Sequence, residues 1–399
     1  MIKFAMVLLP FLLSSAGVLA QHRKLTLEVN PGCGDKCKDR SGALIHVAAI
    51  GPNDTLHHVW DFFGKPTVFL ALTPPNTNLT IDWDAYLSHQ GKSWDFTNST
   101  DYVFALVINK IIEFEDLNGT AVYDPTAHIN KTVIPTDSCE WSLVDESRES
   151  DEHTASLKGT FPKDTNNTGN ILIKLSAFAD AQHSNVTPHL FHTMNSTQVD
   201  FVFNNLTSYF NTSHSRYALD LAVFHTNSNH SILPVNKKKL DDEHSPGVFT
   251  ITDLVTADKD GRNGYLQWKD VAYWSPARIM TNSTIVHLPP ANPPILNASE
   301  SFVKSGVFAY FGEALDDVPA NSVIVSFGTE DDGYYGGTNY ITWTFLAGIG
   351  VPGDDSFSLM VLLILGLGLG IPSVLVVITT GCIISRRINR TRDQLLAGH

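Results

Sequence analysis

The feature that most constrains this chain is a set of thirteen N-x-S/T sequons spread from Asn53 to Asn297. An N-linked glycan is a bulky hydrophilic group, so every asparagine that carries one must lie on the surface of a luminal or secreted region. A chain that accepts glycans along this whole stretch needs exposed loops throughout its fold. The predicted N-glycosylation sites are Asn53, Asn78, Asn98, Asn118, Asn130, Asn166, Asn185, Asn195, Asn205, Asn211, Asn229, Asn282 and Asn297.

Two apolar segments place the sequon-rich region in the secretory pathway. A lysine, an apolar stretch and small residues in succession predict a signal peptide over residues 1–20. Residues 356–385 contain no charged side chain and are long enough to cross a bilayer as a helix. Arginines follow this run and aspartates precede it, so the positive-inside rule predicts a cytosolic tail over residues 386–399. The sequence therefore predicts a type I single-pass membrane protein.

The overall charge of the chain limits which classes of molecule can bind its luminal region. The chain carries a formal net charge of −14 at pH 7, and its short tail is basic, so the luminal region is more acidic than the chain as a whole. Such a surface argues against nucleic acid or anionic lipid as a luminal partner.

Short runs rich in β-branched and aromatic residues recur between turn residues and predict an all-β luminal ectodomain. The luminal region is longer than one hydrophobic core usually serves, which favours two packed β-sandwich domains. We expect them over residues 21–132 and 133–355, with residues 145–152 as the alternative boundary. The runs predicted to be strands are 43–50, 67–72, 102–114, 171–178, 199–203, 217–224, 247–251, 322–327 and 340–346.

Three luminal cysteines, Cys33, Cys37 and Cys139, allow one disulfide and leave one thiol over. Cys33 and Cys37 lie close enough in sequence to pair with each other, and a bridge from Cys139 to either of them is equally compatible with the sequence. The C-x-x-C spacing of zinc or redox sites is absent.

The sequence shows no recognisable catalytic site. The G-x-S-x-G and H-E-x-x-H motifs are absent, and the histidines occur singly or in pairs. The acidic segment 241–243 follows three lysines and has the composition of a solvated loop. We therefore predict no catalytic, cofactor-binding or metal-ligating residues and no cofactor.

Three segments in this order and spacing, 240–249, 267–273 and 340–352, resemble the glycosylated lysosomal membrane protein family. The segments 55–60 and 106–114 resemble the same family more weakly. The resemblance implies a heavily glycosylated type I lysosomal protein of β-sandwich architecture. It also implies the role of accessory subunit to a lysosomal transporter of the major facilitator superfamily, which the luminal region shields from proteases.

The membrane segment and tail carry the remaining candidate sites. Gly366 and Gly370 form a small-residue face suited to close packing against a partner helix. The tyrosine-based sorting signal expected of the family is missing from the tail, where Asp393, Leu395 and Leu396 form a dileucine candidate instead. Two alternatives to the accessory role are a membrane-tethered luminal hydrolase and a cell-surface receptor or adhesion ectodomain.

Overall fold

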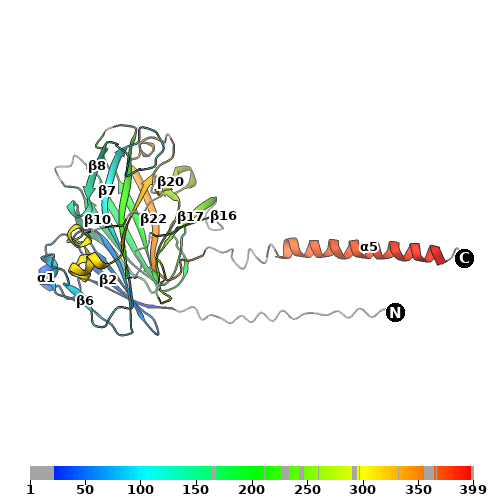
Figure 1. The fold of residues 1–399 in the computed structure, drawn as a ribbon, viewed down its shortest axis with the longest axis horizontal. Coiled ribbons are helices and arrows are strands. Elements are labelled where there is room, and N and C mark those ends of the chain that lie inside the picture. The colour runs from blue at the N-terminus through cyan, green and yellow to red at the C-terminus, as the bar shows by residue number, and fades with distance from the viewer. Residues whose placement is uncertain are drawn as a thin grey trace. The chain divides into compact units, whose positions relative to one another are not determined.

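Antiparallel β-strands form nearly all of the regular structure before the C-terminal helix in a computed structural model of the chain (Figure 1). The structure describes residues 22–162, 168–210, 212–226, 233–241, 247–258, 260–289, 294–295, 297–330, 332–354, 364 and 366–396. The predicted signal peptide lies outside these residues.

The first of two large sheets has the strand order β1-β2-β3-β4-β7-β15-β21-β20, and β8 pairs with the second half of β7. All of these pairs are antiparallel, so hairpins and longer returns connect them. The strands are β1 (Lys24–Val29), β2 (Leu44–Ile50), β3 (Thr55–Asp61), β4 (Thr67–Thr73), β7 (Tyr102–Glu115), β8 (Lys131–Pro135), β15 (Ser215–His225), β20 (Ser283–His287) and β21 (Ala320–Phe327).

The second sheet has the order β9-β10-β11-β14-β22-β18-β17-β16, and β19 lies between the other part of β22 and β20. Its strands are β9 (Glu140–Arg148), β10 (Glu152–Thr160), β11 (Asn170–Phe178), β14 (Ser196–Asn204), β16 (Val235–Asp241), β17 (Val248–Val255), β18 (Gly264–Lys269), β19 (Val271–Tyr273) and β22 (Tyr340–Ile349). Because β20 pairs with β19 on one side and β21 on the other, it joins the two sheets along one edge.

The two sheets enclose one hydrophobic core. Inward side chains from both of them, including Trp60 and Phe104 of the first sheet and Phe201 and Trp343 of the second, belong to a single continuous cluster of buried residues. The Trp60 indole also donates a hydrogen bond of 3.3 Å across the core to Thr197. The apolar residues at alternate positions of each strand fill this interior, as in other sandwiches.

The ectodomain therefore does not divide as the sequence analysis expects. Residues up to Gly353 form one compact unit, and the expected boundary after residue 132 falls inside β8. β15 comes from the expected second domain but pairs along almost all of β7, which comes from the first. Sequence length alone favours two cores, whereas this long-range pairing merges both halves into one sandwich.

Short helices and a hairpin cover part of the outer face of the first sheet (Figure 1). Their aromatic residues, such as Trp83, Phe308 and Phe311, belong to a second buried cluster with Val59 and Phe69 of the sheet. Both β3 and β4 are covered on both faces, and β4 is a nearly continuous apolar run, whereas β3 also buries two histidines. The elements are α1 (Trp83–Leu87), β5 (Leu79–Ile81), β6 (Trp94–Phe96), α2 (Ala298–Ser301) and α3 (Gly306–Phe311).

The remaining elements are short apart from the C-terminal helix. β12 (Gln182–His183) and β13 (Phe191–His192) form a small hairpin, and the 3₁₀ turns are Gly34–Cys37, Thr136–Ser138, Met280–Asn282, Gly312–Asp317 and Tyr335–Gly337. A π-helical turn, Gly366–Gly370, leads into α5 (Ile371–Leu396), which belongs to a separate unit from the ectodomain.

The all-β prediction is confirmed, and each of the nine predicted runs overlaps a strand. The nine runs leave out both polar and buried strands. β9 and β16 lie at sheet edges, where charged and hydroxylated residues can face water. β3 and β18 are buried along their whole length, but histidine, glutamine and lysine residues interrupt their apolar positions.

Candidate functional site

The sequon asparagines that the structure describes lie in loops, in short helical turns or beside strand ends, and none of them is buried. Eight are exposed: Asn53, Asn78, Asn98, Asn118, Asn130, Asn185, Asn205 and Asn297. Asn195 and Asn282 are partly exposed, and Asn166, Asn211 and Asn229 lie outside the described residues. Turn positions suit glycans because a bulky addition there leaves the ladder hydrogen bonds intact.

Three of these asparagine side chains already make hydrogen bonds. The Asn98 amide nitrogen donates to the Thr77 hydroxyl at 3.0 Å, and the Asn130 amide nitrogen donates to a Glu115 carboxylate oxygen at 2.6 Å. The Asn195 amide oxygen accepts from the guanidinium of Arg23 at 3.1 Å. An N-linked sugar replaces only one of the two amide hydrogens, so each of these contacts is compatible with glycosylation.

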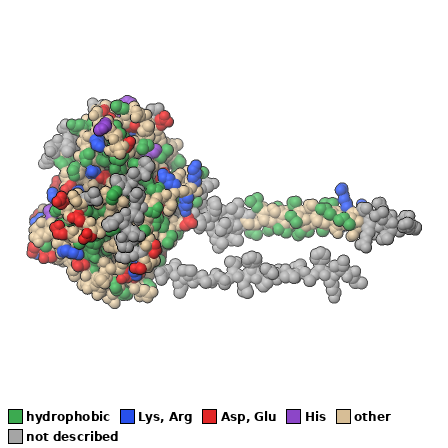
Figure 2. Space-filling view, in the orientation of Figure 1, with side chains coloured by type: hydrophobic (Ala, Val, Ile, Leu, Met, Phe, Trp, Pro, Cys, Tyr) green, Lys and Arg blue, Asp and Glu red, His purple; other side chains and the backbone are tan. Residues whose placement is uncertain are grey.

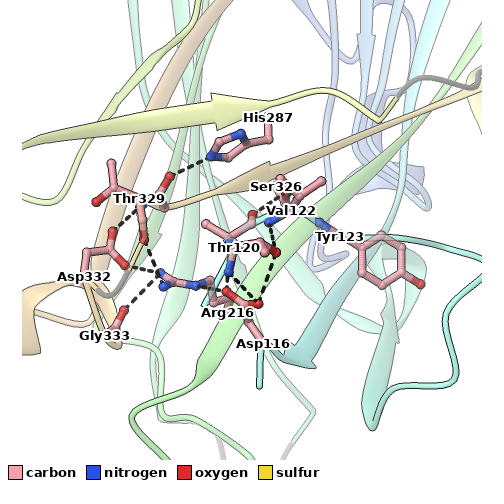
Figure 3. Close-up of polar contacts among 12 residues, drawn as sticks. Asp116, Thr120, Val122, Tyr123, Arg216, His287, Ser326, Thr329, Asp332 and Gly333 are labelled. Atoms are coloured by element: carbon pink, nitrogen blue, oxygen red, sulfur yellow. Dashed lines mark hydrogen bonds and ion pairs between the residues drawn. The ribbon is translucent and has the colours of Figure 1, made fainter. Parts of the chain in front are cut away.

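The most extensive buried polar network centres on Arg216 of β15 (Figure 3). Its Nε donates to Asp116 at 2.9 Å, its Nη1 atom contacts Asp332, and its remaining donors reach the carbonyl oxygens of Thr329 and Gly333 at 3.1 and 3.2 Å. Burial alone would lower the pKa of Arg216, but the hydrogen bonds that it donates to Asp332 and Asp116 outweigh this effect, so the pKa is raised. The guanidinium therefore stays charged between two buried carboxylates.

The same network orders the loops at this end of the sandwich. Asp116 also accepts hydrogen bonds from the amides of Thr120 and Ala121, and the Ala121 carbonyl accepts one from Ser326 of β21. Its role is structural, since each of the three guanidinium nitrogens of Arg216 donates to an acceptor within the fold. Sequence analysis misses this network because its two carboxylates lie about a hundred residues from Arg216 in opposite directions.

A row of histidines lies buried on β2 and β3. His46 Nε2 and His57 Nδ1 share a hydrogen bond of 2.9 Å, and His58 Nδ1 shares one of 2.7 Å with the Thr197 hydroxyl. Burial lowers the pKa of His46 to about 4 and is the main reason why those of His57 and His58 fall to about 3. These imidazoles are neutral even in a moderately acidic compartment, so they are packed core groups.

Asp61, at the end of β3, is a buried acid with a shifted pKa. Burial raises the pKa of its carboxyl to about 6, although hydrogen bonds from the Tyr86 hydroxyl and the Phe63 amide oppose the rise. The adjoining cavity measures about 10 Å³, which is room for about one water molecule. A substrate cannot reach this acid through such a space.

One group of side chains among the described residues has the composition of a cation site. Ligand atoms of His22, Asp151 and Asp180 lie within 4.8 Å of one another, and His22 Nδ1 is 3.0 Å from the Asp180 carboxylate. His22 and Asp151 are exposed, and the His22–Asp180 contact already forms a surface ion pair when the histidine is protonated.

Comparison with known proteins shows similarity to one family along most of the chain. A profile of the family described as "Glycosylated lysosomal membrane protein" matches residues 43–390. The chain belongs to this family. It is 30% identical to glycosylated lysosomal membrane protein B of Xenopus laevis over 90% of this chain and 89% of that protein. It is 27% identical to the Danio rerio protein of the same name over 90% and 88%, and 25% identical to that of Homo sapiens over 90% and 87%.

Membership of the glycosylated lysosomal membrane protein family agrees with the C-terminal helix. Residues Gly366–Arg390 form a helix that contains an 18-residue stretch with a mean hydropathy of 2.2, long and apolar enough to cross a membrane. Figure 2 shows hydrophobic side chains along this helix and basic ones toward its C-terminal end. The protein is thus a lysosomal membrane protein with one C-terminal span, and the names of its relatives state no enzymatic activity.

The predicted sites of this span lie on a continuous helix. Apart from the helix's own backbone and the adjacent residues, no atom of the described residues comes within 4 Å of where a Cβ would stand on Gly366 or Gly370, so that face is open to a partner. The helix continues to Leu396, which places the backbone of Asp393, Leu395 and Leu396 in its last turns. Residues 356–363 and residue 365 of the predicted span lie outside the described residues.

The pairing of the luminal cysteines is one of the alternatives that the sequence leaves open. Cys33 and Cys37 form a disulfide across the turn after β1, and Cys139 is a free thiol. Cys139 is buried in the main core, where burial raises the pKa of its thiol to about 12. A thiol in this state is unreactive.

Proposed function

We propose that this protein is a non-enzymatic accessory subunit that stabilises a lysosomal transporter of the major facilitator superfamily against luminal proteolysis. The observation that carries the proposal is the distribution of the sequon asparagines, exposed or partly exposed in turns around the sandwich wherever the structure describes them. Glycans at those turns would cover the segments that a protease attacks first, both on this chain and on loops beneath it.

The composition of the membrane helix favours an accessory role for this chain over transport by the chain itself. Residues 366–385 include no Asp, Glu, Lys, Arg or His. A proton or polar substrate crossing a membrane needs ionisable or polar groups facing an aqueous path, so a single helix of this kind needs a partner to take part in transport. The open face of Gly366 and Gly370 offers a site for close helix packing.

The buried polar groups give little support to the alternative of a luminal hydrolase. Asp61, whose pKa is shifted towards that of a general acid, adjoins space for about one water molecule. The carboxylates of Asp116 and Asp332 are both engaged by Arg216. These groups stabilise the fold. None of the three carboxyl groups is accessible to a substrate as a general acid or base.

Affinity purification of the tagged full-length protein from lysosome-enriched membranes in mild detergent tests the proposal. We expect a multi-pass transporter to co-purify in stoichiometric amounts, and its abundance to fall when this chain is deleted while its transcript level is unchanged. Recovery of the chain alone, with normal levels of all lysosomal transporters after its deletion, would reject the accessory role.

A further inference from the structure

Protein covers the outer face of the first sheet over β3, β4, β7 and the start of β2, but not over β1 and the end of β2. The covering layer of α1, α3 and the β5–β6 hairpin packs on residues such as Val59, Phe69 and Val103. Beyond it, the outward side chains of β1 are exposed, and Ile50 at the end of β2 keeps 41% of its surface in contact with solvent. The outward residues beside Ile50 on β1 are polar, so this part of the face combines one exposed apolar side chain with groups that can hydrogen-bond.

A groove of about 370 Å³ lies over this uncovered part of the sheet. Its floor includes Thr26, Glu28, His46, Ala48 and Ile50 from β1 and β2, and one wall is the segment 76–79, which contains the sequon asparagine Asn78. This volume is within the range of about 300–1,000 Å³ found for small-molecule sites. The attachment point of a predicted glycan is thus part of the groove wall.

The backbone of Asn78 is fixed, whereas its side chain is available. Its amide N–H donates to the Thr97 hydroxyl at 3.0 Å, and its carbonyl accepts from the Thr97 amide at 2.9 Å. The described residues provide no hydrogen bond to the Asn78 side chain, in contrast to Asn98 and Asn130. A sugar on Asn78 would therefore start from a fixed point at the rim of the groove without breaking a contact.

We propose that the N-glycan of Asn78 folds back into this groove and that its first sugars cover the outer face of β1 and β2. An N-acetylglucosamine ring has an apolar face, which Ala48 and Ile50 can contact, and hydroxyl and amide groups, which Glu28, Thr26 and His46 can hydrogen-bond. Because the glycan is covalently attached, the contact costs no translational entropy of association, so few interactions suffice. The sugar completes a layer that protein supplies over the rest of this face.

This inference rests on the glycosylation that the proposed function also uses, but it is independent of any transporter. The first test uses the full-length glycoprotein in detergent and follows native removal of glycans by an endoglycosidase with site-resolved mass spectrometry. We expect release at Asn78 to be about tenfold slower than at the exposed Asn118, a ratio that disappears after denaturation. Equal native rates at the two sites, or an unmodified Asn78, would overturn the proposal.

The second test separates loss of the sugar from loss of the asparagine. Thr80→Val removes the sequon but retains Asn78 and the side-chain shape, and Thr80→Ser retains both the sequon and the hydroxyl that bonds to Asp95. We expect hydrogen exchange of the β1 and β2 amides to be faster in Thr80→Val than in Thr80→Ser or in Asn118→Gln. Unchanged exchange in Thr80→Val would show that the glycan does not contact the sheet, and the accessory role would still stand.

Discussion

The residues that matter most to stability are the polar groups buried in the sandwich. Arg216 lies between Asp116 and Asp332, and all three side chains are almost fully buried. Taking these charges out of water is costly, and their mutual contacts together with hydrogen bonds to nearby backbone groups offset the cost. Loss of one partner therefore leaves an unpaired buried charge.

We predict that Arg216→Met destabilises the luminal domain by about 3–5 kcal/mol, because two buried carboxylates lose their only counter-ion in the network. Urea unfolding of the full-length protein in detergent, followed by tryptophan fluorescence, measures the change. Arg262→Gln is the matched control: Arg262 pairs with Asp101 at the surface, so its loss should cost about 1 kcal/mol or less. Equal effects of the two substitutions would contradict the structural role of the network.

The buried histidines couple stability to pH. For His46, His57 and His58 the pKa is lowered on folding from 6.5 to about 4, 3 and 3, so the unfolded chain binds protons more tightly. Their contribution to stability is complete above pH 6.5 and is lost as pH falls toward these folded values. Asp61 acts in the opposite sense, since its raised pKa of about 6 adds stability as pH falls from 6 toward 3.8.

We predict that the free energy of unfolding falls between pH 7 and pH 5, and that His58→Gln reduces this fall by about 2 kcal/mol. Glutamine keeps a hydrogen-bonding group near Thr197 and does not titrate. Asp61→Asn should have the reverse effect and make the fall steeper. Unfolding curves at pH 7 and pH 5 measure the free energy of unfolding of the wild type, His58→Gln and Asp61→Asn. Identical pH dependence in His58→Gln and the wild type would refute the explanation.

At the scale of elements, the strands and the C-terminal helix serve different purposes. Alternating or continuous apolar positions commit each strand to a core, whereas α5 buries nothing within the described chain. Its apolar surface is available to lipid and to other helices. The glycines at its start form the surface on which another backbone could approach most closely.

We predict that Gly366→Leu with Gly370→Leu lowers the amount of transporter that co-purifies, because bulky side chains block close helix packing. Gly368→Leu is the matched control, since it lies on another side of the same turn and adds the same side chain. Cell fractionation should show that all variants still insert into membranes. Equal recovery of transporter with both sets of variants would exclude this face from the interface.

We also predict that Leu395→Ala with Leu396→Ala raises the amount of protein at the cell surface, because the pair forms the candidate sorting signal of the tail. Surface biotinylation of the full-length protein measures this pool, and Leu375→Ala, which changes a leucine in the membrane span, is the control. An unchanged surface pool would mean that delivery to lysosomes depends on another signal, such as one on the partner.

At the scale of the whole molecule, the turns at both ends of the sandwich carry the predicted glycans. Asn53 follows β2 and Asn185 lies between β11 and β14, at one end of the strands, whereas Asn118 follows β7 and Asn205 follows β14, at the other. One compact unit with glycans at both ends has few exposed segments for a protease to enter.

We predict that replacing the exposed sequon asparagines by glutamine in groups shortens the lifetime of the complex in lysosomes more than it lowers the unfolding free energy of this chain. The physical reason is that glycans block access to loops while the core holds the fold together. Pulse-chase lifetimes with and without protease inhibitors, beside unfolding curves, measure the two effects. Losses of equal size in both measurements would count against shielding.

The sequence by itself determined the features that depend on local pattern. Alternating apolar residues predicted the strands, an uncharged apolar run predicted the membrane helix, and the three quoted motifs pointed to the family. The positions of the sequons predicted turns, and the described asparagines are indeed unburied. Each strand run, sequon and membrane segment is contained within about thirty residues, and the family motifs need only their order along the chain, so no knowledge of the fold is needed to read them.

Only the tertiary structure decided which distant segments meet. The pairing of β7 with β15 merged two expected domains into one sandwich, and it placed Arg216 between carboxylates a hundred residues away on either side. The same holds for the groove beside Asn78, whose floor and wall come from separate strands and a loop. Pairing energy between strands depends on the partner that is available in space, and a linear sequence does not specify that partner.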